Sequence, residues 1–350
     1  PLRRQRQMCI RDRKKNKLKK ILIVGAGWYG CHIGLYLKQK KHNVKIYEKS
    51  SDIFLGSSGY NQFRLHTGYH YPRSSKTIEE AKKNYFNFVK RYKKFISFPK
   101  KNIYCIAKEK SLIDAKTYEI IIKSHNLKFS KKKINVLQNI EGSYNCNEGI
   151  LLNGKIKKFF KKNLKENLFF NTKVKNIEKE KKKYDFVLDC TNTTLDKKLN
   201  NNFNYVLTIS LVYRKNKKHS VYPITIMDGK LPSLYPYADK KDMYTLTHSD
   251  YTHIKKFKNF DQLEQHKTKI KTKTISKIRD KMENDMTFFF PSFKKIFKYS
   301  DYFLSYKVLP NDNSARRSTF IEKKGNLISC TSPKIGNIFS LESYIKKIIK

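Results

Sequence analysis

The chain has 350 residues, which is long enough to bury a substantial core and to form two domains. Its 77 lysines and arginines outnumber its 29 aspartates and glutamates, which gives a formal net charge of +48. Lysines are spread along the whole chain, and asparagine, isoleucine, tyrosine and phenylalanine are abundant beside them. We interpret this composition as the signature of an AT-rich coding sequence. A nucleic-acid partner is not expected, although the charge leaves that alternative open.

Hydropathy and cysteine usage exclude several classes of protein. No apolar run approaches the roughly 18 residues of a membrane span, so we expect no transmembrane segment. The six cysteines form no CxxC pair and have no regular spacing. Neither a zinc site nor a disulfide framework is indicated, so we expect no metal and a cytoplasmic location.

Residues 1–13, PLRRQRQMCIRDR, resemble translated sequencing-adapter sequence. They lack the apolar stretch of a signal peptide, and the first predicted strand begins soon after them. We interpret them as a non-native segment.

The segment Lys20 to Glu48 has the order of a strand, a glycine turn, a helix and a second strand. The apolar run 21–24 is typical of a parallel strand buried on both faces. In the turn, Gly25 allows a tight bend, Gly27 lets a pyrophosphate approach the backbone, and Gly30 lets the helix pack closely on the strand. The helix N-terminus then favours the phosphates. The segment therefore predicts a dinucleotide site.

The second predicted strand ends at Glu48, whose carboxylate is placed to accept hydrogen bonds from the adenosine ribose hydroxyls. That acid would repel a 2′-phosphate, so the pattern disfavours NADP. We expect Trp28, Tyr29 and Lys49 to contribute further contacts to the same nucleotide.

A loop rich in serine, glycine, tyrosine and histidine follows, and it can reach back over a bound cofactor with the hydroxyls of Ser57 and Ser58. Four of its residues have the spacing N-x-x-x-x-H-x-G-x-x-Y: Asn61, His66, Gly68 and Tyr71. The loop resembles that of the FAD-dependent oxidoreductases of the D-amino-acid oxidase type, which include glycine oxidase and L-2-hydroxyglutarate dehydrogenase. The resemblance implies that FAD is the cofactor and that this loop lies against the flavin.

Two later blocks resemble the same family. Residues 149–164 resemble its helix before the adenine-contacting strand, and the resemblance places Val174 against adenine. At the end of YDFVLDCTN, Thr191 and Asn192 resemble the turn that closes over the cofactor. Asparagine tolerates the left-handed conformation that glycine would supply there.

The block near the C-terminus, GNLISCTSPKIGNIFSLESYIKK, resembles the family's last strand and helix. The resemblance places the turn with Lys334 and Ile335 at the pyrimidine edge of the flavin. A lysine there would stabilise the anionic reduced flavin by charge attraction.

Together these features predict an α/β protein. It has a Rossmann-like, doubly wound and mainly parallel FAD-binding domain, and an inserted substrate domain with a mixed or antiparallel sheet. We assign residues 19–85, 148–196 and 300–350 to the FAD-binding domain, and residues 86–147 and 197–299 to the substrate domain. The lysine-rich stretch 260–286 predicts one helix on the outer face of the substrate sheet.

Three residues are candidates for catalysis. His66 can accept a hydroxyl proton because histidine titrates near neutral pH, and a structural loop histidine is the alternative. Arg64 stands out because this chain otherwise prefers lysine, and a guanidinium binds a carboxylate in a bidentate manner. Tyr71 completes the set through the family resemblance.

Further arginines and tyrosines are candidates for substrate contacts. Arg316 is retained against the lysine bias, as are Arg73 and Arg317, and a surface salt bridge is the alternative for each. Tyr235 and Tyr237 can line the pocket with hydroxyls, and ordinary packing is the alternative.

The predicted activity is FAD-dependent oxidation of a small carboxylate-bearing amine or 2-hydroxy acid by hydride transfer to flavin N5, with an unknown electron acceptor. Two alternatives stay open: a flavin-dependent enzyme that modifies RNA, and a protein that binds FAD without catalysis. A simple NAD dehydrogenase would need neither the His66 loop nor the C-terminal turn.

Overall fold

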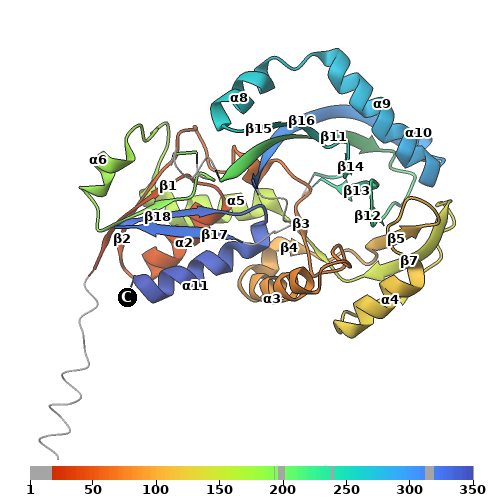
Figure 1. Ribbon diagram of the computed structural model, residues 1–350, viewed down its shortest axis with the longest axis horizontal. Coiled ribbons are helices and arrows are strands. Elements are labelled where there is room, and N and C mark those ends of the chain that lie inside the picture. Colours follow the sequence, from red (N-terminus) through yellow and green to blue (C-terminus); the bar gives the residue numbers. More distant parts are fainter. Residues whose placement is uncertain (1–17, 193, 196–201, 238–239, 312–318, 350) are drawn as a thin grey trace, which may run out of the picture.

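The computed structural model describes residues 18–192, 194–195, 202–237, 240–311 and 319–349. These residues form two large sheets and one small sheet, with helices on their faces (Figure 1). The N-terminal segment 1–13 and the arginines Arg316 and Arg317 lie outside the described residues. None of the helices in the described ranges combines the length and the apolarity needed to cross a membrane.

The first sheet has six strands in the order β17-β18-β10-β1-β2-β9. In that order the strands are Phe320–Lys324, Leu327–Thr331, Phe186–Asp189, Lys20–Val24, Asn43–Tyr47 and Leu168–Phe169. All neighbouring pairs are parallel except β17 with β18. The predicted doubly wound, mainly parallel sheet is confirmed.

Helices cover both faces of this sheet because successive residues of β1 point to opposite sides. Ile21 and Ile23 join a core formed with the helices on one face. These helices are α2 (Trp28–Gln39), α5 (Asn153–Leu164) and α11 (Ile338–Ile348). Leu22 and Val24 join a smaller cluster on the other face, beside α6 (Ile177–Lys181).

The second sheet has nine strands and lies beside the first, curving from β16 and β11 at the top to β5 and β7 at the lower right (Figure 1). Its main path is β15-β11-β14-β13-β12-β5-β7-β6, and β16 pairs with β11. In path order its strands are His253–Phe257, Phe203–Lys215, Met243–His248, Pro232–Pro236, Ile224–Met227, Ile103–Ala107, Ile140–Cys146 and Phe129–Lys131, with Phe297–Pro310 as β16. The sheet is mixed, because β5 and β12 are parallel while the other pairs are antiparallel.

Strand β16 corrects one predicted domain boundary. The boundary at residue 300 is wrong, because Phe297–Pro310 pairs with β11 from end to end. Backbone hydrogen bonds therefore hold residues 300–310 in the nine-stranded sheet.

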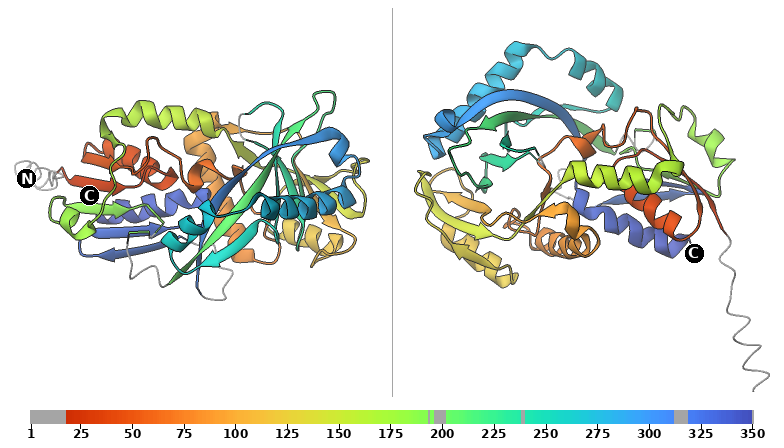
Figure 2. Two further views of the ribbon diagram at one scale, coloured as in Figure 1. Left: turned by 90° about the horizontal axis from the view of Figure 1, so that it is seen from above. Right: turned by 180° about the vertical axis from the view of Figure 1, so that it is seen from behind.

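Three helices cover the outer face of the nine-stranded sheet (Figure 2). They are α8 (Phe260–Thr268), α9 (Thr272–Phe289) and α10 (Phe293–Ile296). The prediction of a single helix over 260–286 is wrong, because Lys271 has an extended backbone with ψ 145°. Between the two helices, Ile270 packs against the apolar clusters that both helices help to form.

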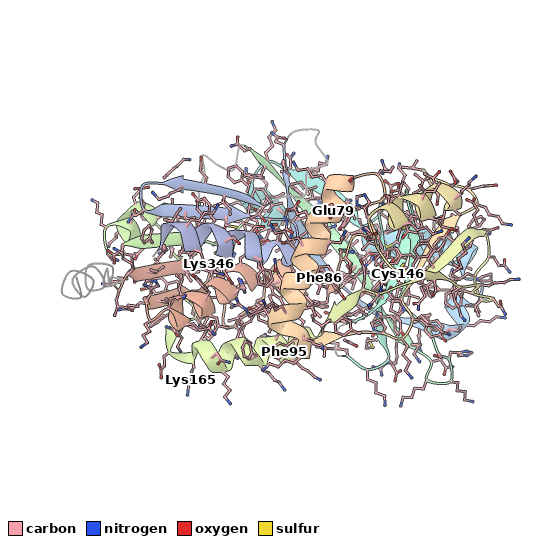
Figure 3. All side chains as sticks on the ribbon, turned by 90° about the horizontal axis from the view of Figure 1, so that it is seen from below. Glu79, Phe86, Phe95, Cys146, Lys165 and Lys346 are labelled. Atoms are coloured by element: carbon pink, nitrogen blue, oxygen red, sulfur yellow. The ribbon has the colours of Figure 1, made fainter. Side chains whose placement is uncertain are left out.

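A small sheet, β3-β8-β4, links the two large ones. Its strands are Arg64–Leu65, Gly149–Leu151 and Ile96–Ser97. Helix α3 (Ser75–Tyr92), capped by Ser74, crosses between the two large sheets (Figure 3). The predicted boundary at residue 85 therefore falls inside a helix, and Phe88 and Tyr92 pack with Trp28 of α2. Helix α4 (Ala115–Ser124), capped by Asp114, packs at the far end of the larger sheet.

Candidate active site

The candidate site lies where β3 meets β8. The two strands are antiparallel, with Arg64 opposite Ile150 and Leu65 opposite Gly149. The next pair outward is His66 and Glu148. His66 Nδ1 lies 3.6 Å from Glu148 Oε2, and Glu148 is only 2% exposed. Strand register thus places a buried carboxylate beside the candidate base.

Glu148 is held by hydrogen bonds from two further segments. The Thr67 backbone N–H donates to Oε1 over 2.7 Å, and the Tyr104 hydroxyl donates to Oε2 over 2.5 Å. The same Tyr104 oxygen accepts a hydrogen bond from Arg64 Nη2 over 2.7 Å. Tyr104 therefore connects the guanidinium to the carboxylate.

The guanidinium of Arg64 lies between two tyrosine rings. Its Cζ is 4.1 Å from the centroid of the Tyr235 ring and 5.6 Å from that of Tyr104. The Tyr235 hydroxyl points elsewhere and donates to Asn102 Oδ1 over 2.6 Å. Arg64 Nε is buried and has no hydrogen-bond partner among the described residues. A buried donor of this kind favours an anionic ligand.

The electrostatics of the site keep His66 neutral. Burial and then the charge of Arg64 lower the pKa of His66 to about 4, with a smaller effect from Lys334 and an opposing one from Glu148. Burial by itself would raise the pKa of Glu148, but His66, Arg64 and Tyr104 outweigh it and lower that pKa. A carboxylate beside Nδ1 favours the Nδ1–H tautomer, which leaves Nε2 as a proton acceptor.

The predicted C-terminal turn reaches the same place. Lys334 Nζ lies 3.8 Å from the centroid of the Tyr71 ring, and that ring meets His66 edge-on. The Tyr29 hydroxyl donates to the Lys334 carbonyl over 2.8 Å. Ile335 begins the short helix Ile335–Asn337. The structure therefore brings Tyr71 and Lys334 to the candidate base.

The glycine turn supports the predicted dinucleotide site. Gly25 has φ +97°, which favours glycine. A Cβ at Gly30 would lie 1.9 Å from the Gly25 carbonyl oxygen, so only glycine fits there. Gly27 at the start of α2 has no side chain to cap the helix, and the hydroxyl of Ser58 accepts the Trp28 N–H over 3.0 Å instead.

Glu48 lies at the end of β2, as predicted. Its Oε2 accepts the Ala26 N–H over 2.8 Å, and its Oε1 accepts the Ser50 N–H over 2.9 Å. Each carboxylate oxygen has a further lone pair, which a ribose hydroxyl can use. The acid therefore also fixes the glycine turn.

The second predicted turn has the expected backbone. Asn192 has φ +59°, which is the left-handed conformation that the sequence predicts. Thr191 donates its N–H and its hydroxyl to Asp189 Oδ1. This turn faces the glycine turn, because a Cβ at Gly25 would lie 3.0 Å from the Cys190 carbonyl oxygen.

Other predicted residues have structural contacts. The indole of Trp28 packs in the core against Phe54, Phe88, Tyr92 and Phe160, so only its backbone faces the turn. Val174 is buried on the other face of the first sheet.

Three loop residues and one tyrosine also have partners in the fold. Ser57 donates to the Tyr306 carbonyl, and Asn61 bonds the backbone of Ser57 and Phe63. Lys49 Nζ lies over the Phe260 ring, 5.0 Å from its centroid. Tyr237 stacks on the rings of Phe63 and Phe303. Their roles toward cofactor or substrate stay predictions.

A family comparison decides what kind of protein this is. Residues 20–298 match the model of the family described as DAO, FAD dependent oxidoreductase. The chain belongs to this family. It is an FAD-dependent oxidoreductase of the DAO type, as the loop with Asn61 and His66 predicts.

Two curated relatives of this DAO-type chain come from fungi. It is 30% identical to the FAD-dependent monooxygenase FPY4 of Fusarium mangiferae, over 93% of this chain and 90% of the relative. It is 24% identical to the FAD-dependent monooxygenase kojA of Aspergillus flavus, over 93% and 85% of the two chains.

Solved structures share the fold of this DAO-type oxidoreductase. Glycine oxidase from Geobacillus kaustophilus matches with a TM-score of 0.70 at 11% identity, over 95% of this chain and 94% of the other. L-alpha-glycerophosphate oxidase from Mycoplasma pneumoniae, solved with FAD bound, matches with a TM-score of 0.69 at 13% identity, over 95% of each chain.

The residues present fit FAD. The turns at Gly25 and Asn192 offer backbone without bulky side chains, and the start of α2 at Gly27 lacks a side-chain cap of its own. A pyrophosphate would lie on that helix start. Glu48 would bind the ribose, and Lys334 would supply a positive charge near the flavin.

Two residues of the site, Glu148 and Tyr104, were not predicted from the sequence. Strand pairing brings both residues to the site from distant parts of the chain. Glu148, for example, lies 81 positions after Thr67, whose N–H it accepts. One signal was present. Acids are scarce in this chain, and Glu148 directly precedes the apolar strand Gly149–Leu151.

Proposed function

We propose that this enzyme oxidises a small amine or 2-hydroxy acid that carries one carboxylate. The carrying observation is the half-buried Arg64, whose buried Nε has no hydrogen-bond partner among the described residues and whose guanidinium lies in the same network as a neutral His66. Arg64 would bind the substrate carboxylate, with Tyr104 and Tyr235 holding the guanidinium in plane.

The charge of the site supports a monoanion. The guanidinium of Arg64 is positive, its Nε has no hydrogen-bond partner among the described residues, and His66 beside it is neutral. A substrate carboxylate would pair with that guanidinium, whereas an uncharged analogue would leave the Nε donor unsatisfied.

Proton transfer would fall to His66. Its Nε2 would accept the proton of a substrate hydroxyl or ammonium group while Glu148 stabilises the imidazolium that forms. Bound FAD supplies the hydride acceptor, at N5 of the flavin. Tyr71 and the stem of Lys334 would close one side of the pocket against water.

The test is anaerobic reduction of the FAD-loaded enzyme by a candidate substrate, measured as the loss of visible flavin absorbance. Small amino acids and 2-hydroxy acids are compared with their amides, which have the same shape without the charge. We expect reduction by at least one carboxylate and not by its amide. Bound FAD that amides and carboxylates reduce equally well, or that neither reduces, would overturn the proposal.

Arginine variants sharpen this test. Arg64→Lys should raise KM for the carboxylate, because a lysine lacks the planar pair of donors. Arg73→Lys is the matched control, since Arg73 is exposed and bonds Asp228. An unchanged KM in Arg64→Lys would contradict the assignment of Arg64 to the substrate carboxylate.

A second candidate is oxygenation of the substrate. The relatives in Fusarium mangiferae and Aspergillus flavus are named FAD-dependent monooxygenases, and such enzymes transfer one atom of O₂ to the substrate. Turnover under heavy-isotope O₂ separates the two candidates. Labelled product supports oxygenation, whereas unlabelled product that forms with another electron acceptor supports simple oxidation.

A further inference from the structure

Glu148 is a buried acid whose contacts come from two other segments of the chain. It lies between β7 and β8, the Thr67 N–H comes from the loop after β3, and the Tyr104 hydroxyl comes from β5. His66 Nδ1 lies against the same carboxylate oxygen as Tyr104. A charged group so far from solvent is unfavourable unless its partners compensate for it. This cost points to a specific role.

Tyr104 stands between Glu148 and Arg64. Arg64 Nη2 donates to the Tyr104 oxygen, and the Tyr104 hydroxyl donates to Glu148. The negative charge thus stabilises the guanidinium through a neutral hydroxyl. A direct bidentate pair would occupy two of the arginine donors. The observed arrangement leaves Nε available for another anion.

We propose that Glu148 is a positioning residue that prepares two groups at once: the Nδ1–H tautomer of His66 and, through Tyr104, the orientation of Arg64. This inference rests on the proposed function, because it assigns His66 as the base and Arg64 as the carboxylate binder. Glu148 does not itself touch the substrate.

The groups around His66 decide what removal of the Glu148 charge does. The charged and titratable groups that face it are Arg64, His70, Tyr71, Glu148 and Lys334, with Tyr104 behind Glu148. Arg64 and Lys334 lower the pKa of His66, and Glu148 is the group that raises it. Without the carboxylate, His66 should be a weaker base, and its two tautomers should become closer in population.

The first experiment needs no substrate. Nitrogen-15 NMR of the histidine side chains in the FAD-loaded enzyme reports the tautomer and the pKa of each ring, and His66→Asn assigns the His66 signals. We expect the Nδ1–H tautomer in the wild type. An Nε2–H tautomer in the wild type would overturn the proposal, whether or not any variant folds.

The second step compares Glu148→Gln with Glu119→Gln. Glu119 is a matched control, because it also accepts a tyrosine hydroxyl, that of Tyr144 over 3.0 Å, but its charged partner is Lys131 and not a histidine. We expect Glu148→Gln to lower the pKa of His66 and to weaken its tautomer preference. The control should change neither. Unchanged His66 signals in a folded, FAD-loaded Glu148→Gln protein would overturn the proposal.

Kinetics then separate positioning from simple structural support. In Glu148→Gln, kcat should fall about 10- to 100-fold, as expected for loss of a carboxylate that orients a histidine. KM for a carboxylate substrate should change less than kcat, because the side-chain oxygen of the introduced glutamine can still accept the Tyr104 hydroxyl and keep Arg64 oriented. Tyr104→Phe should raise KM, because Arg64 loses the hydroxyl that orients it, and should leave the His66 tautomer unchanged. If KM rose in Glu148→Gln while kcat stayed constant, the inference would fail.

The two hypotheses fail in different ways. If no amine or 2-hydroxy acid reduces the flavin but His66 has the Nδ1–H tautomer that Glu148→Gln weakens, the proposed substrate class is wrong and the positioning role stands. If carboxylates reduce the flavin but the tautomer does not respond, the positioning role is wrong and the proposed function stands.

Discussion

Tyr235 and Arg64 are stacked, with the guanidinium Cζ of Arg64 4.1 Å from the centroid of the Tyr235 ring. Tyr235 belongs to β13 of the nine-stranded sheet, whereas Arg64 belongs to β3 of the small sheet. The stack therefore joins two sheets at the candidate substrate site. It also holds the positive charge of a half-buried side chain against an aromatic face.

This stack predicts that the ring of Tyr235, rather than its hydroxyl, matters for substrate binding. A cation over a desolvated aromatic ring gains about 1–2 kcal/mol, which corresponds to about a 5- to 30-fold change in a binding constant. Tyr235→Leu should therefore raise KM for a carboxylate substrate by about that factor. Steady-state kinetics on FAD-loaded protein measure it.

Tyr235→Phe is the matched control, because it keeps the ring and removes only the hydrogen bonds of the hydroxyl, which donates to Asn102 and accepts from Thr225. Its KM should stay within about twofold of the wild type, with a stability loss of about 1 kcal/mol. Equal KM values for the two variants would show that the stack does not hold Arg64 for binding.

The glycine turn predicts selective loss of FAD. A Cβ at Gly27 would lie 2.9 Å from Ser58 Oγ, which caps the first N–H of α2. Gly27→Val should displace that hydroxyl and fill the space where the pyrophosphate would approach, so FAD binding should be abolished while the fold persists. Absorbance of bound flavin, with circular dichroism as the check on folding, measures this.

Gly56→Ala is a suitable control, because an added Cβ there meets nothing within 4 Å. It should bind FAD as the wild type does. Stoichiometric FAD in Gly27→Val would refute the assignment of this turn to the cofactor.

The first domain was predictable because its signals are local. The strand, the turn with Gly25 and the helix after it lie within one continuous segment. Contacts between neighbouring residues therefore determine the conformation of that segment. The left-handed backbone of Asn192 could likewise be predicted, because asparagine adopts that conformation more readily than most residues do.

The rest depended on pairings between distant segments. Glu148 meets His66 only through the β3–β8 register, and Tyr104 arrives on a third strand. The helix is interrupted before Thr272, where Ile270 packs against two apolar clusters. The helix propensity of a lysine-rich stretch does not indicate such a tertiary contact. Strand β16 pairs with β11 across a long insertion, so the boundary at residue 300 had no local signal.

The environment of His66 predicts an unusual pH profile. Because burial and Arg64 lower its pKa to about 4, His66 stays neutral and able to accept a proton well below pH 6.5. With a 2-hydroxy acid as substrate, the rate of flavin reduction should be constant from about pH 8 to about pH 5.5. It should fall about tenfold per pH unit below about pH 4. Stopped-flow reduction under anaerobic conditions measures this.

His66→Asn separates the histidine from the substrate carboxyl group, which titrates in the same range. The variant should be about 100-fold slower at pH 7. Only the acid limb that belongs to the substrate should remain. A wild-type rate that already halves near pH 6.5 would mean that His66 titrates normally and that its surroundings do not act as described.

A second buried pair predicts acid sensitivity of the fold. His32 of α2 and Glu342 of α11 lie 2.9 Å apart, Nε2 to Oε2, with Arg91 and Lys346 beside the carboxylate. Burial would raise the pKa of Glu342, but His32 and Lys346, with Arg91, lower it to about 2. Since the folded pKa is lower than the unfolded one, this stabilisation is complete above about pH 4.5. It is lost as the pH falls toward 2.

His32 acts in the same direction, because burial lowers its pKa and the unfolded chain then binds the proton more readily below about pH 6.5. Glu342→Gln should therefore lower the free energy of unfolding at pH 7 by about 3 kcal/mol and flatten its decline between about pH 4.5 and 2. Urea denaturation at several pH values measures both effects. Glu79→Gln is the control, since Glu79 is an exposed residue of another helix, α3. Figure 3 labels Glu79 and also Lys346, which pairs with Glu342 on α11. The control should change the curve much less, because water screens the ion pairs of Glu79 with Lys82 and His125. An equally flat curve in both variants would mean that surface charge, rather than the His32–Glu342 pair, sets the acid limit.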